Sequence, residues 1–118
     1  ILVRLSTTAA LPDKLNSRFS SNVGADVKQV FNGQVTATAT LPSGFDIPIP
    51  FAENFTFDPT KGNLLVDITT SAGAGEARVD AAYVAGDGAS RIFATNPYAT
   101  KAAYADTQAD VIRLELAQ

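Results

Sequence analysis

Apolar and polar side chains alternate with a period of two over most of this chain. Residues 1–5 place Ile1, Val3 and Leu5 on one face. From residue 31 to residue 41 the odd positions are apolar or small, whereas the even positions carry Asn, Gln and Thr. A period of two is typical of a half-buried β-strand. The pattern predicts strands over both segments, with the first extending weakly toward residue 10.

Five further segments carry a strand signal, with turn residues between them: Phe45–Phe51, Leu64–Ile68, Glu76–Val84, Ser90–Thr95 and Asp110–Leu116. Pro48 and Pro50 cannot donate to a ladder, so the first of these is expected at a sheet edge or with one unpaired side. Seven or eight short strands at this spacing predict one all-β domain over residues 1–118, an antiparallel β-sandwich of jelly-roll type.

Residues 11–19 form the only helix-like stretch. Leu11, Leu15 and Phe19 recur at four-residue spacing, and Pro12 suits a first helical turn. Because nothing continues the spacing, we expect a single helical or 3₁₀ turn there, followed by a loop over residues 20–26. Residues 96–107 are expected to form a polar connection. In the last strand Ile112, Leu114 and Leu116 are expected to face inward.

Turn residues with defined conformational roles precede two of these strands. Asp58 and Pro59 are expected to open a turn, Gly62 to supply a left-handed position and Asn63 to cap it, after which Leu64, Val66 and Ile68 fill the core. Gly86-Asp87-Gly88 fits a tight hairpin loop with positive φ. Arg91 follows closely enough to pair with Asp87 and hold that hairpin.

Composition narrows the function classes. The chain has 46% hydrophobic and only 18% charged residues, with a net charge of −3. Its Lys and Arg residues are scattered singly, so it lacks the cationic footprint that nucleic acids or an anionic membrane surface require. No run approaches the roughly 20 apolar residues of a membrane span. No signal peptide is evident either, so an exported chain of this sequence is expected to be a mature form or an excised piece.

Catalytic chemistry has few candidate residues. The chain contains no His, Cys, Met or Trp. It therefore lacks the usual general base near neutral pH, the strongest nucleophile and the soft metal ligands. No Ser-x-x-Lys spacing occurs, and strand carboxylates such as Asp46, Asp67, Asp80 and Glu115 lie on polar faces or at strand ends. We expect a non-enzyme, with a hydrolase built on paired carboxylates as the hypothesis to exclude.

Two weaker ligand hypotheses remain. Loop aspartates are available as oxygen ligands for Ca²⁺, although they would have to converge from different loops; otherwise they are ordinary turn residues that bind their own backbone. Tyr98 and Tyr104 share one predicted loop and are the best aromatic surface for a sugar, or else they cover the edge of the sandwich. Asn54-Phe-Thr56 matches a glycosylation sequon. The candidate calcium ligands are Asp26, Asp58, Asp87 and Asp106.

The middle of the chain resembles a known family. Phe45-Asp-Ile, then Phe55-Thr-Phe-Asp-Pro59, then Gly62-Asn-Leu-Leu-Val-Asp-Ile68 resembles a segment of exported bacterial proteins that carry a PEP-CTERM sorting tail. Leu15-Asn-Ser-Arg-Phe19 and Asp87-Gly-Ala-Ser-Arg-Ile-Phe93 resemble its flanking regions. Asn54 stands where the family pattern has Pro. The tail itself is not in this sequence, which implies that it has been removed or that this relative works without it.

The resemblance implies an envelope or extracellular β-sandwich of largely unassigned function, with no catalytic residues to carry over. We therefore expect a non-catalytic, exported structural or interaction module. Its partner, another protein or a second copy, is expected at sheet edges, and the first strand is expected to pair in its own domain or in a neighbour's. The alternative is a carbohydrate-binding, lectin-like domain, assisted by calcium.

Overall fold

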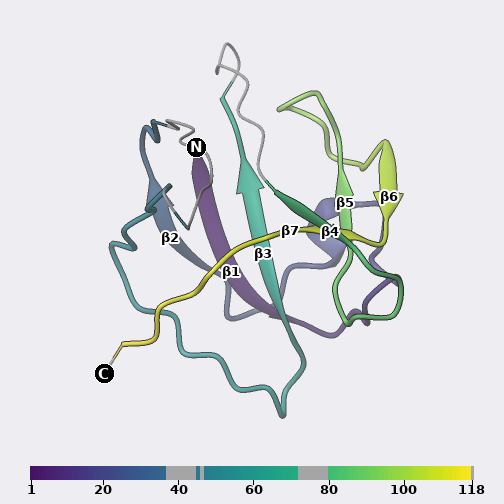
Figure 1. Cartoon of the computed structure of the whole chain (residues 1–118), viewed down its shortest axis with the longest axis horizontal. Helices are drawn as coiled ribbons and strands as arrows, with labels where there is room; N and C mark the ends of the chain where they lie inside the picture. The colour runs from purple at the N-terminus through teal and green to yellow at the C-terminus, as the bar shows by residue number, and fades with distance from the viewer. Residues whose placement is uncertain (37–44, 46, 72–79, 118) are drawn as a thin grey trace.

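Seven short strands and one 3₁₀ turn make up the regular structure of the computed structural model, which describes residues 1–36, 45, 47–71 and 80–117 (Figure 1). All the pairings between these strands are antiparallel. The chain is therefore all-β, as the alternation predicts. The elements are β1 (Leu2–Thr8), η1 (Phe19–Ser21), β2 (Lys28–Asn32), β3 (Asn63–Thr69), β4 (Ala81–Tyr83), β5 (Arg91–Phe93), β6 (Tyr104–Asp106) and β7 (Gln108–Asp110).

The strands form three small sheets. The largest has the order β2-β1-β3, whereas β4 pairs with β7 and β5 pairs with β6. Within the described part of the chain these sheets do not close on one another, so the predicted sandwich or jelly roll is not confirmed. The longest described helical element is the three-residue turn η1, and no helix there is long and apolar enough to cross a membrane.

The core lies against β1, the central strand of the largest sheet. Val3 and Leu5 of β1 are buried together with Val30 of β2. Partly buried side chains pack around these three, on the face that the odd positions of β1 predict: Ile1, Phe31, Ile49, Phe55, Leu64 and Val66. The predicted first strand is thus confirmed, and it extends to Thr8.

The second strand differs from its prediction. The ladder of β2 covers Lys28–Asn32 and ends before the described residues 33–36, while residues 37–41 of the predicted strand lie outside the described part. The register shifts between Val3 and Arg4, where Val30 is the extra residue of a β-bulge. Because a bulge reverses the parity of the residues beyond it, the fully buried side chain is Val30 at an even position.

Residues 45 and 47–51 do not form the predicted strand. Pro48 and Pro50 cannot donate, and only one backbone hydrogen bond, from Ala52 to the Val30 carbonyl, joins the end of this segment to β2. Ile49 packs on the core, but Phe45 is 54% exposed and Phe51 is also exposed. The face predicted to be buried is therefore buried at Ile49 but exposed at Phe45 and Phe51. No ladder hydrogen bonds fix the orientation of this segment.

The turn at Gly86-Asp87-Gly88 is confirmed, but it does not close a hairpin. Both glycines have positive φ, at 76° and 84°. The strands on either side of the turn belong to different sheets, since β4 pairs with β7 and β5 with β6. The predicted Arg91–Asp87 pair is also wrong: Asp87 accepts a hydrogen bond from the Ala89 amide, 3.0 Å away. Residues 76–79 of the strand predicted before this turn lie outside the described part.

The end of the chain departs furthest from its pattern. The expected polar connection over 96–107 contains β6, and the last strand is β7 at Gln108–Asp110 rather than Asp110–Leu116. Ile112, Leu114 and Leu116, expected to face inward, are all exposed, and Leu116 is 90% exposed. In Figure 1 this yellow segment runs across the large sheet toward the C-terminus without joining a ladder.

The predicted helical turn forms a few residues late. Residues 12 and 13 form a simple turn, closed by the Lys14 amide on the Leu11 carbonyl, and the 3₁₀ turn begins at Phe19. The buried Asn22 side chain explains the shift. Its oxygen accepts the Asn16 amide at 2.7 Å, and its nitrogen donates to the Asn16 carbonyl at 2.8 Å. These local bonds compete with a helix over residues 11–19.

Candidate functional site

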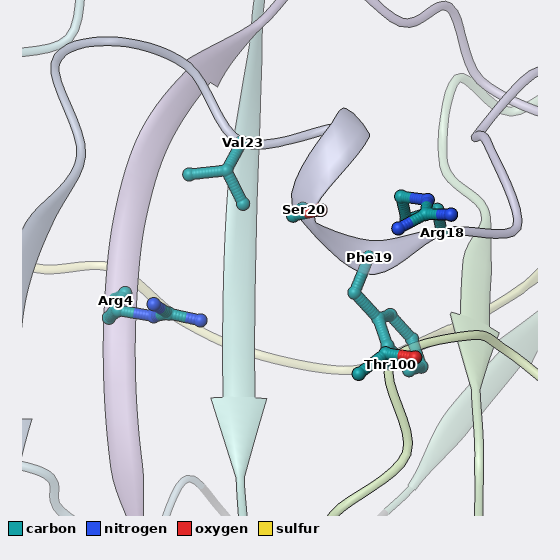
Figure 2. Close-up of a pocket in the computed structure, with 6 residues that line it drawn as sticks. All are labelled: Arg4, Arg18, Phe19, Ser20, Val23 and Thr100. Atoms are coloured by element: carbon teal, nitrogen blue, oxygen red, sulfur yellow. The ribbon is translucent and has the colours of Figure 1, made fainter.

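A cavity of about 440 Å³ opens beside β1 and η1 (Figure 2). Figure 2 shows the Phe19 ring beside Thr100, with Arg4 extending from β1 toward them. The walls come from three separate stretches of the chain and combine two guanidinium groups, two hydroxyls and two apolar side chains. The lining residues are Arg4, Arg18, Phe19, Ser20, Val23 and Thr100.

An isolated β-bridge holds two of these stretches together. Arg18 and Lys101 are its antiparallel partners. The Phe19 amide donates to the Thr100 carbonyl at 3.2 Å, and the Ala102 amide donates to the Ser17 carbonyl at 2.8 Å. These bonds flank the bridge, so Arg18 and Lys101 form a non-hydrogen-bonded pair, the geometry in which opposing side chains come closest.

Arg4 contributes a partly compensated cation to the same cavity. Its Nη2 donates to Asp67 of β3, which is also its register partner across the sheet. Its Nε is buried and has no hydrogen-bond partner among the described residues. The cavity therefore combines one neutralised guanidinium group, which has a spare buried donor, with the cation of Arg18.

A second cluster forms around Arg91 at the junction of the two small sheets. Arg91 Nε and Nη2 donate to the two carboxylate oxygens of Asp106 at 3.0 and 3.2 Å, and Nη1 donates to Asp110 at 3.1 Å. Arg91 also donates to Gln108. The hydrogen bond from Arg91 lowers the pKa of Asp106, and the same bond raises the pKa of Arg91. One side chain of β5 thus ties together β6 and β7.

An aromatic pair adjoins this cluster. Phe93 and Tyr104, opposite each other in the β5–β6 ladder, stack with ring centroids 5.0 Å apart, and the Arg91 guanidinium lies 4.8 Å from the Phe93 ring centre. Tyr104 remains 55% exposed. The two tyrosines were predicted to share one loop, but Tyr104 lies in β6, whereas Tyr98 lies 79% exposed in a turn closed on Asn96.

The remaining predicted calcium ligands bind threonines: Asp26 ties its loop to β1, whereas Asp58 serves its own turn. Asp26 accepts the amide and hydroxyl of Thr7 at 2.8 and 2.6 Å, and Asp58 accepts the amide and hydroxyl of Thr60 at 3.0 and 2.7 Å. Lys61 forms a 3.7 Å ion pair with Asp58. Within the described ranges, no three acidic residues gather into a group that could hold a metal ion.

The turn residues before β3 are placed as predicted, with one change of partner. Asp58 and Pro59 open the turn, which the Lys61 amide closes on the Asp58 carbonyl at 3.1 Å. Gly62 has a φ of 151°, in the range that favours glycine. Asn63, expected to cap the turn, instead donates from its side chain to the Ala10 carbonyl at 3.0 Å. It therefore links β3 to the segment after β1.

Sequence reasoning missed the cavity and the partners of Arg91. The cavity joins residues 4, 18–23 and 100, which lie far apart in the chain and share no motif. One feature of the sequence could have indicated two partners of Arg91. Asp106 lies two residues before Gln108, and this spacing places both side chains on one face of an extended chain. No family model, curated protein or solved structure matches this chain.

Proposed function

We propose that this protein is a non-catalytic interaction module of an exported assembly, and that a protein partner adds a strand along β3. The observation that carries the proposal is the outer edge of that strand. β3 spans Asn63–Thr69 and pairs only with β1 among the strands of the described ranges. An edge of seven residues presents a row of backbone donors and acceptors, which is a template for a further strand.

The apolar surface supports a partner. In the described part of the chain three hydrophobic side chains are buried, while 14 large ones are exposed. The accessible surface is 8802 Å². A compact monomer of this mass exposes about 6100 Å² by the scaling of folded monomers. The excess of about 2700 Å² on this one chain is enough for its side of an obligate interface, since such interfaces bury about 2000–5000 Å² in total and therefore about 1000–2500 Å² on each partner.

The side chains of β3 fit an apolar partner strand. Leu64, Val66 and Ile68 share one face of the strand; the first two pack on the core, whereas Ile68 is 48% exposed. Asp67, on the other face, is already paired with Arg4. A partner strand that alternates apolar and polar residues would extend the apolar face and cover Ile68, and it would complete a larger sheet of the kind that a sandwich requires.

The first strand is not the edge that we propose for a partner. β1 occupies the centre of its own sheet, paired with β2 on one side and β3 on the other. Removing residues 1–5 would delete Val3 and Leu5 from the core. An exported location is proposed from the family resemblance.

A photo-crosslinking experiment in the producing cell tests the proposal. A benzophenone amino acid replaces Ile68 on β3 in one variant and Val111 in a matched control, since these side chains are 48% and 46% exposed. We expect one discrete protein adduct from position 68 and none from position 111. Hydrogen exchange should show the β3 amides protected in the recovered complex and exchanging faster in the isolated chain. Equal adducts from both positions, or none from position 68, would contradict the proposal.

One observation favours carbohydrate binding as a second candidate. The Tyr104 ring is held by its stack on Phe93 and stays more than half exposed, on the same short strand as Asp106. A fixed, exposed aromatic face near a carboxylate suits a sugar ring. A glycan array probed with the intact protein and with Tyr104→Ala, each with and without a chelator, tests this function. No binding by the intact protein in either condition rules it out.

A further inference from the structure

We propose that the cavity between β1 and η1 binds the carboxylate of a small organic acid, with Arg18 and Lys101 supplying the charge. The cavity's volume, about 440 Å³, lies within the range of small-molecule sites. This site is separate from the β3 edge and does not depend on the interaction proposed there.

The first argument is electrostatic. Arg18 and Lys101 stand directly opposite each other in a non-hydrogen-bonded antiparallel bridge. Like charges in that position destabilise the pairing. Neither side chain forms an ion pair with another described residue. In a chain with a net charge of −3, these two cations therefore stand opposite each other, and one of them, Arg18, lines the cavity. A bound anion would relieve their repulsion.

The second argument comes from Arg4. Its Nη2 is bound to Asp67, but the buried Nε has no partner within the described residues. A buried donor without an acceptor is unfavourable, and an oxyanion in the cavity could accept it. No carboxylate is among the lining residues, whereas the hydroxyls of Ser20 and Thr100 are, and both are able to donate.

The remaining walls define the body of the ligand. Phe19 and Val23 are apolar, and Figure 2 shows the Phe19 ring projecting toward Thr100 within the cavity. An inorganic anion would leave this apolar surface uncovered. A carboxylate on a compact apolar body, such as an aromatic acid, would place charge at the arginines and bury carbon against the ring.

Titration followed by NMR tests the site, with benzoate as the probe and benzamide as its uncharged analogue. We expect benzoate to shift the amides of residues 18–23 and 100–102 with a Kd on the order of 1 mM at low salt. Benzamide should produce no saturable shift. Arg18→Gln should weaken benzoate binding by about tenfold, because it removes one of the two cations. Arg113→Gln is the control, since Arg113 pairs with Glu115 away from the cavity.

The melting temperature, measured without and with benzoate, gives an independent test of the proposal. Lys101→Gln removes the opposing cation and should raise the melting temperature of the free protein. Adding benzoate should raise the melting temperature of the natural chain and have less effect on the variant. The proposal is overturned if benzoate gives no saturable shift up to about 20 mM, if benzamide binds equally, or if Arg113→Gln weakens binding as much as Arg18→Gln.

Discussion

At the scale of single residues, Arg91 has the most connections. It binds Asp106 through two nitrogens and also reaches Asp110 and Gln108, so one guanidinium group joins strands of two different sheets. Only a planar group with several fixed donors can satisfy these acceptors together. The short strands β5, β6 and β7 have three residues each, and few ladder hydrogen bonds hold them. Their relative position therefore depends on this side chain.

Replacing Arg91 should consequently cost stability even when the charge is kept. For Arg91→Lys we expect a loss of about 1–2 kcal/mol, since a lysine keeps one contact and leaves the other carboxylate and amide oxygens without their donor. Urea denaturation monitored by circular dichroism measures the change. Arg113→Lys is the matched control. Because its partner Glu115 is exposed, we expect this variant to change the free energy of unfolding by less than about 0.5 kcal/mol. Equal losses in both variants would contradict the role of Arg91.

Asp26 should make folding stability depend on pH in the acid range. The hydroxyl and then the amide of Thr7 lower the pKa of Asp26 below its usual value of 3.8. A carboxylate with a depressed pKa stabilises the fold fully above its unfolded value, and this contribution disappears as the pH falls through the folded value. We therefore expect the melting temperature of the natural chain to fall below about pH 4. Asp26→Asn should make the melting temperature fall less steeply with decreasing pH. Part of the fall should remain, because the pKa values of Asp58 and Asp106 are also lowered.

At the scale of elements, close approach of backbones decides which residues the turn before β3 accepts. Gly62 has a φ of 151°, and a Cβ at this position would lie 2.5 Å from the carbonyl oxygen of Thr8. Gly86 also has a positive φ, but a Cβ there would meet nothing within 4 Å. The two glycines therefore separate the effect of backbone conformation from the effect of crowding.

Alanine at these two positions should give different losses. Gly86→Ala places a side chain in an unfavourable backbone region and should cost about 1 kcal/mol. Gly62→Ala adds a clash with β1 and should cost at least about 2 kcal/mol, because the clash is with backbone that cannot move without disturbing the β1–β3 ladder. Thermal denaturation of both variants gives the comparison. A larger loss at Gly86 would show that the turn before β3 is looser than the structure indicates.

At the scale of the whole molecule, little apolar surface is hidden. Among the residues that the structure describes, the core consists of three buried hydrophobic side chains and the partly buried residues around them. The described segment after β7 is exposed and joins no ladder. Such a chain has a small driving force for folding alone, and a partner that covers its apolar surface would stabilise it.

The dependence of stability on urea should reflect this open surface. The slope of that dependence scales with the area exposed on unfolding. From the accessible surface of 8802 Å², we expect the slope for the isolated chain to be about a quarter lower than for a compact chain of equal mass. Equilibrium denaturation followed by fluorescence of the tyrosines measures it. A slope typical of a compact monomer would contradict an incomplete surface and weaken the case for a partner.

Part of this fold could be predicted from local pattern. The alternation identified β1, β3 and β5, because each is a short run whose buried face is fixed by its own ladder. The turns at Asp58 and at Gly86–Gly88 were also predicted, since a residue's own backbone preference decides them. The same alternation failed over 45–51 and 111–116, where the side chains alternate but no neighbouring strand supplies the hydrogen bonds that would orient them.

What the sequence by itself determined is therefore local: the all-β class, the main turns, and an absence of histidine and cysteine that removes the commonest chemistry. The tertiary structure alone decided which strands share a sheet, that Arg91 binds Asp106 rather than Asp87, and that Arg18 faces Lys101 beside a cavity. The physical reason is the separation along the chain over which each kind of interaction acts. Alternation and turn preference act between neighbours in the chain, whereas ion pairs, stacks and cavities join residues up to about a hundred positions apart, which only the folded backbone brings together.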